Sequence, residues 1–292
     1  MRVEMITSPQ NQWVLEARKL KQKKYREARG QFLVEGLRLA EEAVKSGKVI
    51  EAYYHDTLSG TERGEALLKS LSATGCRFFQ VSSRVLDALA ETETPQGIIL
   101  VAERRAAGLK DLAGKAFAPQ SDAAAGSGKG SSVGDRAASA GPGQGPELLV
   151  VMDSVRDPGN LGAVLRTLWA AGGRGLICLK GTTDPFGGKA VRASMGGIFN
   201  VPVCVERDWD EVARWAIRQG YSVVAADIRE AEDYRRYVWP KKTMLCVGNE
   251  GRGLITVKPE DIAARVMIPL AGGAESLNAA VAAGILIYEA CR

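Results

Sequence analysis

From residue 147 onward, short apolar segments alternate with segments that have helical spacing. Six apolar segments have the length of strands: ELLVVMD, GLICLK, VPVCVE, SVVAADI, TMLCVGN and RVMIPL. The helical segments lie between them, and SLNAAVAAGILIYEACR follows the last one. Such alternation predicts an α/β fold with a parallel sheet covered on both faces. Ligands on such sheets bind beyond the carboxyl ends of the strands, which directs attention to the residues that follow each strand.

A segment of low complexity separates this region from the part before it. From Pro119 to Pro146, 21 of 28 residues are Gly, Ala, Ser or Pro. These residues bury too little apolar surface to offset the entropy of ordering them. We therefore predict a first domain at residues 1–105, a flexible linker at 106–146 and a second domain at 147–292.

The first domain reads as a small α/β unit. The segment QFLVEGLRLAEEAVKSG, residues 31–47, has the apolar spacing of a helix packed by one face, and VIEAYYH, CRFFQV and GIILVAE read as strands. Residues 16–29 hold seven Lys or Arg and two Glu, an excess equal to the formal net charge of the whole chain, +5. This basic segment suits either RNA or DNA phosphates or a solvated helix face, and charge alone leaves both interpretations open.

Several classes of protein are excluded by what the sequence lacks. The start of the chain has no signal-peptide pattern, and no run of about 18 apolar residues occurs, so we expect a cytoplasmic protein without a membrane span. Five scattered cysteines without a CxxC pair, and His55 as the one histidine, predict no metal site and no disulfide framework. Phosphate-loop, GxSxG and HExxH motifs are absent, and GNEGRG has its glycines in the wrong order for a dinucleotide site.

The segment DPGNLGAVLRTLWA, residues 157–170, predicts a helix that carries one arginine. Residues 161, 164, 165, 168 and 169 form its apolar stripe, and Arg166 projects from the flank one turn after Gly162. A glycine inside a helix costs about 1 kcal/mol relative to alanine, so we expect another group to approach at Gly162. The acceptor of a reaction at Arg166 is our candidate for that group.

These segments resemble the SpoU (TrmH-type) RNA ribose methyltransferases. DPGNLGAVLRT is similar to the first motif of that family, CVGNEGRGL to the second and IPLAGGAESLNAAVAAGILIYE to the third, in the family's order. KAVRASMGGIFNVPV matches another stretch typical of the family, and SPQNQWVLEARKL with FLVEGLRLAEEA resembles its ribosomal-protein-L30-like RNA-binding extension. The resemblance therefore covers both predicted domains.

The resemblance implies a knotted (trefoil) methyltransferase domain that transfers a methyl group from S-adenosyl-L-methionine to a ribose 2′-hydroxyl. The positions that match the family's site residues fall into two sets. The cofactor-binding set is Gly248, Ile268 and Leu277. The catalytic set is Arg166, which would activate or orient the hydroxyl, with Asn160, Ser276, Asn278 and Glu250.

The family usually acts as a homodimer, and the resemblance implies the same here, with ribosomal RNA as the favoured substrate. Ala280 and Leu270 depart from the family's common serine and methionine. Transfer RNA as the ribose substrate, a base nitrogen as the acceptor, and a non-catalytic RNA-binding assembly factor are the alternatives. Arg166 and the SLN motif disfavour a base acceptor, and the intact cofactor loops disfavour an assembly factor.

Overall fold

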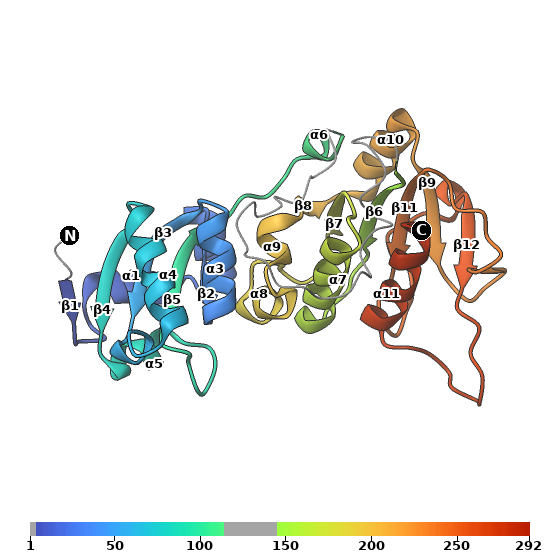
Figure 1. Cartoon of the computed structure of the whole chain (residues 1–292). Coiled ribbons are helices and arrows are strands. Elements are labelled where there is room, and N and C mark those ends of the chain that lie inside the picture. Colours follow the sequence, from blue (N-terminus) through green and yellow to red (C-terminus); the bar gives the residue numbers. More distant parts are fainter. Residues whose placement is uncertain (1–3, 114–144) are drawn as a thin grey trace. The chain divides into compact units, whose positions relative to one another are not determined.

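The computed structural model describes residues 4–113 and 145–292, so most of the predicted linker 106–146 lies outside the described residues. The chain divides into two compact units. One comprises Met1–Ala106, Arg156–Arg166 and Thr183–Phe199, and the other comprises Ala107–Val155, Thr167–Thr182 and Asn200–Arg292. Each unit contains one β-sheet (Figure 1).

The sheet of the first unit has five strands in the order β1-β4-β3-β5-β2. The strands are β1 (Glu4–Ile6), β2 (Gln31–Glu35), β3 (Val49–Tyr54), β4 (Arg77–Val81) and β5 (Ile98–Glu103). The pairs β1/β4 and β3/β4 are parallel, and β5 is antiparallel to both β2 and β3. This mixed α/β sheet agrees with the expected class of the first domain.

Helices cover both faces of this sheet. They are α1 (Gln12–Lys19), α2 (Lys23–Arg29), α3 (Leu37–Lys45), α4 (Glu62–Ala73) and α5 (Ser83–Leu89), with a 3₁₀ turn at Asp56–Leu58. Helices α1 and α5 share one core with Leu33 and Phe79 of the sheet. Because side chains alternate along a strand, Phe32 lies on the opposite face, where α3 contacts β2, β5 and α4.

The structure corrects the helix predicted from Gln31. Residues 31–35 form strand β2, and the helix begins only at Leu37. Gly36 separates the two elements with a φ of +105°, a conformation that neither a helix nor a strand contains. The apolar residues that looked helical at 37–44 belong to α3, whose Leu39, Ala40 and Ala43 are buried.

The sheet of the second unit has seven strands in the order β10-β12-β9-β11-β6-β7-β8, and every neighbouring pair is parallel. The strands are β6 (Glu147–Met152), β7 (Gly175–Leu179), β8 (Val203–Arg207), β9 (Ser222–Ala226), β10 (Glu232–Asp233), β11 (Lys242–Val247) and β12 (Ala264–Met267). The predicted parallel sheet is confirmed. Among these seven strands, only the two-residue β10 was not predicted from the sequence.

The remaining helices are α6 (Leu109–Leu112), α7 (Pro158–Ala170), α8 (Gly188–Ser194), α9 (Gly197–Asn200), α10 (Trp209–Gln219) and α11 (Ala279–Ala290), with a 3₁₀ turn at Pro259–Asp261 (Figure 1). Helix α6 falls in the range that we assigned to the linker. Its Leu109 and Leu112 nevertheless join the core of the second sheet, because they pack with Leu149 and Ile177. The segment KAVRASMGGIF, residues 189–199, falls on the two helices α8 and α9, which are separated at Met195, where φ is +49°.

Candidate functional site

A buried carboxylate holds the loop after β11 against the end of β6. Asp153 is fully buried directly after β6. Its Oδ2 accepts hydrogen bonds from the backbone amides of Ile255 and Thr256, both at 2.7 Å, and of Val257 at 3.1 Å. Its Oδ1 accepts from the hydroxyls of Thr256 at 2.8 Å and Ser154 at 3.1 Å. A buried carboxylate with this many donors fixes the loop in one conformation.

The turn that contains the predicted residues Gly248 and Glu250 is closed by its own backbone. Asn249 and Gly253 exchange two amide–carbonyl hydrogen bonds of 2.8 and 2.9 Å. The Oδ1 of Asn249 accepts from the amides of Gly251 and Arg252, and its Nδ2 donates to the carbonyl of Ser154 at 3.0 Å. The turn is therefore tied both to itself and to the segment that follows β6.

Gly248 allows two backbone segments to cross closely. A Cβ at this position would lie 2.5 Å from the amide nitrogen of Leu254 and would collide with the carbonyl group of Gly253. The predicted residue Glu250 is exposed on the same turn, where its carboxylate accepts a long hydrogen bond of 3.5 Å from Asn249. Ile268 follows β12 and is half-buried. Because β11 and β12 are parallel strands of one sheet, Gly248 and Ile268 lie at the same edge.

The loop from Leu270 to Asn278 is exposed at every residue. It carries the predicted residues Ser276, Leu277 and Asn278 and leads into α11. Leu277 is 38% exposed although it is apolar. The side chain of Asn278 caps α11, because its Oδ1 accepts hydrogen bonds from the amides of Ala280 at 2.9 Å and Val281 at 3.3 Å. The structure thus gives Asn278 a structural function beside its predicted catalytic one.

Helix α7 corrects our interpretation of Gly162. A Cβ on Gly162 would lie 2.5 Å from the Cβ of Ala193 and would collide with the carbonyl oxygen of Ala190. Helix α8 therefore occupies the space beside this glycine, and the site is not open to an acceptor. The prediction that something approaches Gly162 is right, but the group that approaches is protein backbone. This glycine serves helix packing.

Arg166 is exposed on α7, as its position beside the apolar stripe predicts. Leu161, Val164, Leu165 and Leu168 of that stripe are buried, and Trp169 is half-buried. Across the described ranges 4–113 and 145–292, no carboxylate pairs with the Arg166 guanidinium. The surface ion pair that would explain an exposed arginine is thus not seen within these ranges.

Asn160 lies in the first turn of the same helix and is half-buried. Its backbone amide donates to the Oδ1 of Asp157 at 2.9 Å, and Lys189 bonds the other oxygen at 3.0 Å. The amide of Asn160, followed by Lys189, holds the pKa of the Asp157 carboxyl below its ordinary value. Asp157 thereby satisfies an amide at the start of the helix that carries Arg166.

Two cations of the basic segment 16–29 have structural partners. Arg26 is buried, and its guanidinium bonds one oxygen of Asp184 at 2.7 and 2.9 Å and the carbonyls of Leu20 and Lys21. The ammonium of Lys21 donates to the carbonyls of Ala88 and Ala90, and burial lowers its pKa. Arg18, Lys23 and Lys24 are exposed. The basic segment is thus part structural and part surface.

Sequence reasoning missed Asp153 and Asn249 as the residues that hold the site together. Both stand in segments that we quoted for other reasons. A signal was present for Asp153, because an acidic residue directly after a fully apolar strand must be hydrogen-bonded if it is buried. In residues 4–113 and 145–292 no group of three or more His, Cys, Asp or Glu side chains is arranged to hold a metal ion. Nor does any helix in these ranges combine the length and apolarity that crossing a bilayer requires.

Comparison with known proteins accounts for both parts of the chain. The family model described as the SpoU rRNA Methylase family matches residues 147–288, and the model of an MRM3-like substrate binding domain matches residues 11–100. A relative named 23S rRNA (guanosine(2553)-2′-O)-methyltransferase RlmP, from Bacillus subtilis, is 31% identical over 287 residues. The match covers 98% of this chain and 99% of that protein.

Solved structures give the same assignment. An rRNA methyltransferase from Sinorhizobium meliloti, solved with AdoMet bound, is 32% identical with a TM-score of 0.79, over 99% of this chain and 97% of that chain. The SpoU methyltransferase AviRb from Streptomyces viridochromogenes is 25% identical with a TM-score of 0.76, over 95% of each chain. The resemblance that the three motifs predicted is thereby confirmed, and the chain belongs to the SpoU rRNA methylase family.

Proposed function

We propose that this protein methylates a ribose 2′-hydroxyl of ribosomal RNA with S-adenosylmethionine as the methyl donor. The observation that carries the proposal is the match over 98% of the chain to a relative named as a 23S rRNA 2′-O-methyltransferase. A match of this extent includes the substrate-binding part as well as the methyltransferase part.

The residues at the edge of the second sheet fit the donor. A methyltransferase from Sinorhizobium meliloti that is 32% identical to this chain is described with AdoMet bound. Here Gly248 permits a backbone crossing that a Cβ would prevent, because the chain passes close to Gly253 and Leu254 at this point. Half-buried Ile268 and exposed Leu277 supply apolar side chains at this edge and in the loop that follows it. We assign Gly248, Ile268 and Leu277 to donor binding.

When bound, S-adenosylmethionine supplies a methyl group attached to a cationic sulfur. An oxygen nucleophile can take this methyl group, with the sulfur as the leaving group. The chain must then hold the ribose hydroxyl in line and accept or pass on its proton. We assign the first task to Arg166, whose guanidinium can bond a phosphate oxygen beside the target ribose. A guanidinium holds its proton too tightly to act as a base by itself, so proton removal requires help from an RNA phosphate or from water.

We assign supporting positions to Asn160 on the helix of Arg166 and to Ser276, Asn278 and Glu250 on the two loops. The proposal includes a trefoil knot that involves the C-terminal loops and helix α11. It also divides the chain into an RNA-binding domain at residues 1–105, a linker at 106–146 and a methyltransferase domain at 147–292. Helix α6 supports moving the start of the last domain to about Ala107.

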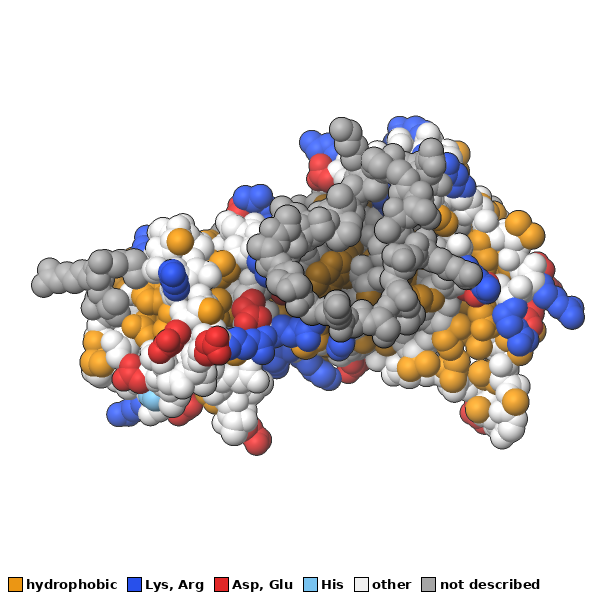
Figure 2. Space-filling view, in the orientation of Figure 1, with side chains coloured by type: hydrophobic (Ala, Val, Ile, Leu, Met, Phe, Trp, Pro, Cys, Tyr) orange, Lys and Arg blue, Asp and Glu red, His pale blue; other side chains and the backbone are white. Residues whose placement is uncertain are grey.

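A homodimer is also part of the proposal, because it would let Arg166 of one protomer act with the donor loops of its partner. Large apolar side chains are exposed on α11 and on the loop before it: Leu270, Leu277, Val281 and Tyr288. Figure 2 shows hydrophobic side chains gathered at the surface in the part of the view where Figure 1 draws α11 and β12. An apolar surface of this kind supports a contact between protomers.

The proposal is tested by methyl transfer to ribosomal RNA from cells that lack the gene. We expect ribose methylation at a defined nucleotide with the parent protein and a loss of at least about 100-fold in Arg166→Ala, as when one key donor to a reacting group is removed. Donor affinity should stay within a few-fold of the parent. Arg218→Ala, on the exposed face of α10, is the matched control.

Two results would contradict this proposal. Parent-level turnover in Arg166→Ala would remove that residue from the mechanism. Failure of the parent protein to methylate any ribose in total ribosomal RNA would remove the function itself.

A further inference from the structure

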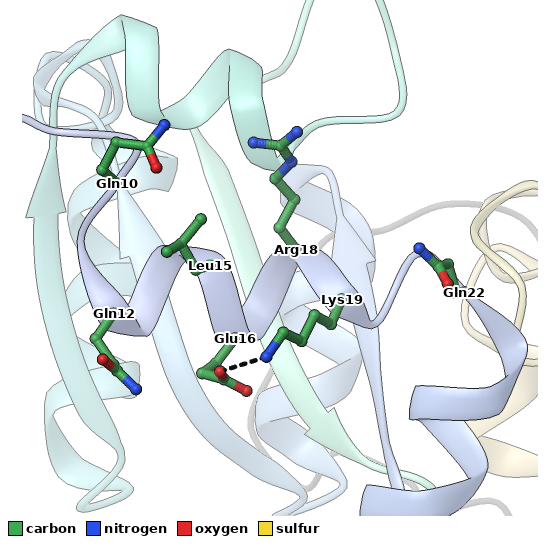
Figure 3. Close-up of a pocket in the computed structure, with 7 residues that line it drawn as sticks. All are labelled: Gln10, Gln12, Leu15, Glu16, Arg18, Lys19 and Gln22. Carbon is green, nitrogen blue, oxygen red and sulfur yellow. Dashed lines mark hydrogen bonds and ion pairs between the residues drawn. The ribbon is translucent and has the colours of Figure 1, made fainter.

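Helix α1 carries an apolar residue on the side that faces away from the core. Val14 and Ala17 are buried against the sheet. Leu15 lies two residues before Ala17, so a helical rotation points it nearly opposite to Ala17. Figure 3 shows the Leu15 side chain on the open side of α1, between the side chains of Gln10 and Arg18. Leu15 is half-buried, so part of its apolar surface stays accessible on this side.

The open side of α1 is hollowed. A cavity of about 490 Å³ lies against it, which falls in the range of about 300–1,000 Å³ that small-ligand sites occupy. Its lining includes five residues from α1 and the turns at its two ends: Gln10, Gln12, Leu15, Arg18 and Gln22. Gln12 and Leu15 lie three residues apart on α1, and Gln22 lies beyond the end of that helix, directly before α2. Gln10 adds a third amide from the turn before the helix.

The electrostatics of this face are cationic. Glu16 also lines the cavity, but its carboxylate is paired with Lys19 at 2.7 Å and with Arg29. The ammonium of Lys19 also lies 5.9 Å from the centre of the Tyr25 ring. Arg18 is exposed. An anionic chain that reaches the cavity therefore meets positive charge at its edge.

The chemistry of the lining separates the possible occupants. Each glutamine amide both donates and accepts hydrogen bonds, as the edge of a nucleobase requires. The apolar Leu15 can pack against the flat face of a base, and Arg18 can bond the adjoining phosphate. A site for the backbone of duplex RNA would instead be lined mainly with Lys and Arg.

We propose that this cavity, the α1 pocket, receives one unpaired base of the RNA, with Arg18 on its phosphate. The proposal rests on the proposed function and deepens it, because it names a recognition site for RNA outside the methyl-transfer site. Sequence-specific RNA recognition commonly uses such splayed-out bases, since the grooves of duplex RNA hide their edges.

The test measures binding of the full chain to a uridine oligomer of about 10 nucleotides, a length that single-strand binding domains commonly cover. Leu15→Ala and the double variant Gln12→Ala, Gln22→Ala should each weaken this binding by roughly 2- to 12-fold. Neither should alter binding to a blunt RNA duplex of equal length or the salt dependence. Arg18→Ala should lower the salt slope by about 0.7, as expected for one phosphate contact on a single strand.

Matched controls come from α4, on the opposite face of the same sheet. Leu68 is half-buried there and Lys69 is exposed. Leu68→Ala and Lys69→Ala should bind the oligomer like the parent. Parent-like binding by Leu15→Ala would overturn the proposal, and so would an equal loss on the duplex. An equal loss of binding to a polyglutamate peptide would assign this face to an acidic protein and would also overturn it.

Methyl transfer to ribosomal RNA, measured on the same preparations, separates this inference from the proposed function. If the parent transfers methyl groups while Leu15→Ala binds the oligomer normally, only the α1 pocket is refuted. If the parent transfers none while oligomer binding still depends on Leu15, only the proposed function is refuted.

Discussion

The two loops that carry the predicted donor-binding residues differ in how the fold holds them. The loop from Gly248 to Val257 is fixed by the buried carboxylate of Asp153 and by the side chain of Asn249. The loop from Leu270 to Asn278 is exposed throughout, and only its last residue has a side chain bonded to the next helix among the contacts described above. Both loops have exposed residues, but the first is anchored to a buried carboxylate and the second lies at the surface throughout.

This difference separates two contributions to a binding site. The fixed loop supplies backbone groups in positions that exist before any ligand arrives, which lowers the entropy lost on binding. The exposed loop carries the predicted residues Ser276 and Leu277 on a segment that lies at the surface throughout. Substitutions in the first loop should therefore act mainly on stability, and those in the second mainly on binding.

The largest expected effect follows from removing the carboxylate of Asp153. In Asp153→Ala the amides of Ile255, Thr256 and Val257 lose their acceptor inside the protein. We expect the free energy of unfolding to fall by about 3–5 kcal/mol, because each unsatisfied buried donor costs about 1–3 kcal/mol. Chemical denaturation with tryptophan fluorescence measures this change.

The control for Asp153→Ala lies in the exposed loop. Glu275→Ala removes a carboxylate that is exposed, and we expect a change within about 0.5 kcal/mol. Equal losses of stability in the two variants would show that the loops are held equally, which would break the comparison.

The next largest effect concerns a glycine in each loop. In Gly248→Ala the new methyl group collides with the backbone of Gly253, which cannot move without opening the turn. We expect a loss of about 1–3 kcal/mol together with weaker donor binding, measured by denaturation and by calorimetry. Gly272 has a φ of +76° and open space around it, so Gly272→Ala should cost only the backbone strain of about 1–2 kcal/mol and should leave the turn at Gly248 intact. Parent-like donor binding by Gly248→Ala would contradict the assigned role of the turn.

Much of the fold was predictable because its signals are local. Apolar strands that alternate with helices predicted the parallel sheet, and the three motifs predicted the family. The helix predicted from Gln31 was wrong at its start, because the apolar spacing of QFLVE fits a strand as well as a helix and only Gly36 separates the two elements. Short apolar segments carry this ambiguity whenever periodicity alone is used.

The contacts around the site were less predictable because they join distant parts of the chain. Asp153 bonds amides more than a hundred residues away, and Gly162 packs against the Ala190 carbonyl of another helix. Spacing within one helix shows that Gly162 leaves a gap, but it does not show what fills the gap. For the same reason the sequence marked Arg26 as a cation without indicating that it is buried on Asp184.

A smaller effect on stability is expected where a side chain is exposed for binding. Leu277 is 38% exposed, so Leu277→Ala should change the free energy of unfolding by less than about 0.5 kcal/mol. Its removal should nevertheless weaken S-adenosylmethionine binding by about 3- to 10-fold, because it takes apolar contact from the donor. Calorimetric titration measures this affinity.

Val238→Ala, at an apolar residue that is 86% exposed, is the control and should bind the donor like the parent. A large loss of stability with unchanged affinity in Leu277→Ala would reverse the assignment of the exposed loop.

The smallest effect is expected at Asp157, four residues after Asp153, where a carboxylate also caps backbone but does so at the surface. The pKa of Asp157 is lowered first by the amide of Asn160 and then by Lys189. A carboxyl whose pKa is lower in the folded state stabilises the protein above its unfolded pKa of about 3.9, and this contribution is lost as the pH falls through the folded value.

Asn can still accept the amide hydrogen bond, so only the charge is removed in Asp157→Asn. We expect the parent to be more stable than this variant by less than about 0.5 kcal/mol at pH 7, since solvent screens the charge, and the difference to shrink as the pH falls below about 3.9. Denaturation curves across this pH range measure the difference. A difference that stays constant with pH would show that the charge of Asp157 contributes nothing, whereas a loss as large as that in Asp153→Ala would show that burial is not what distinguishes the two carboxylates.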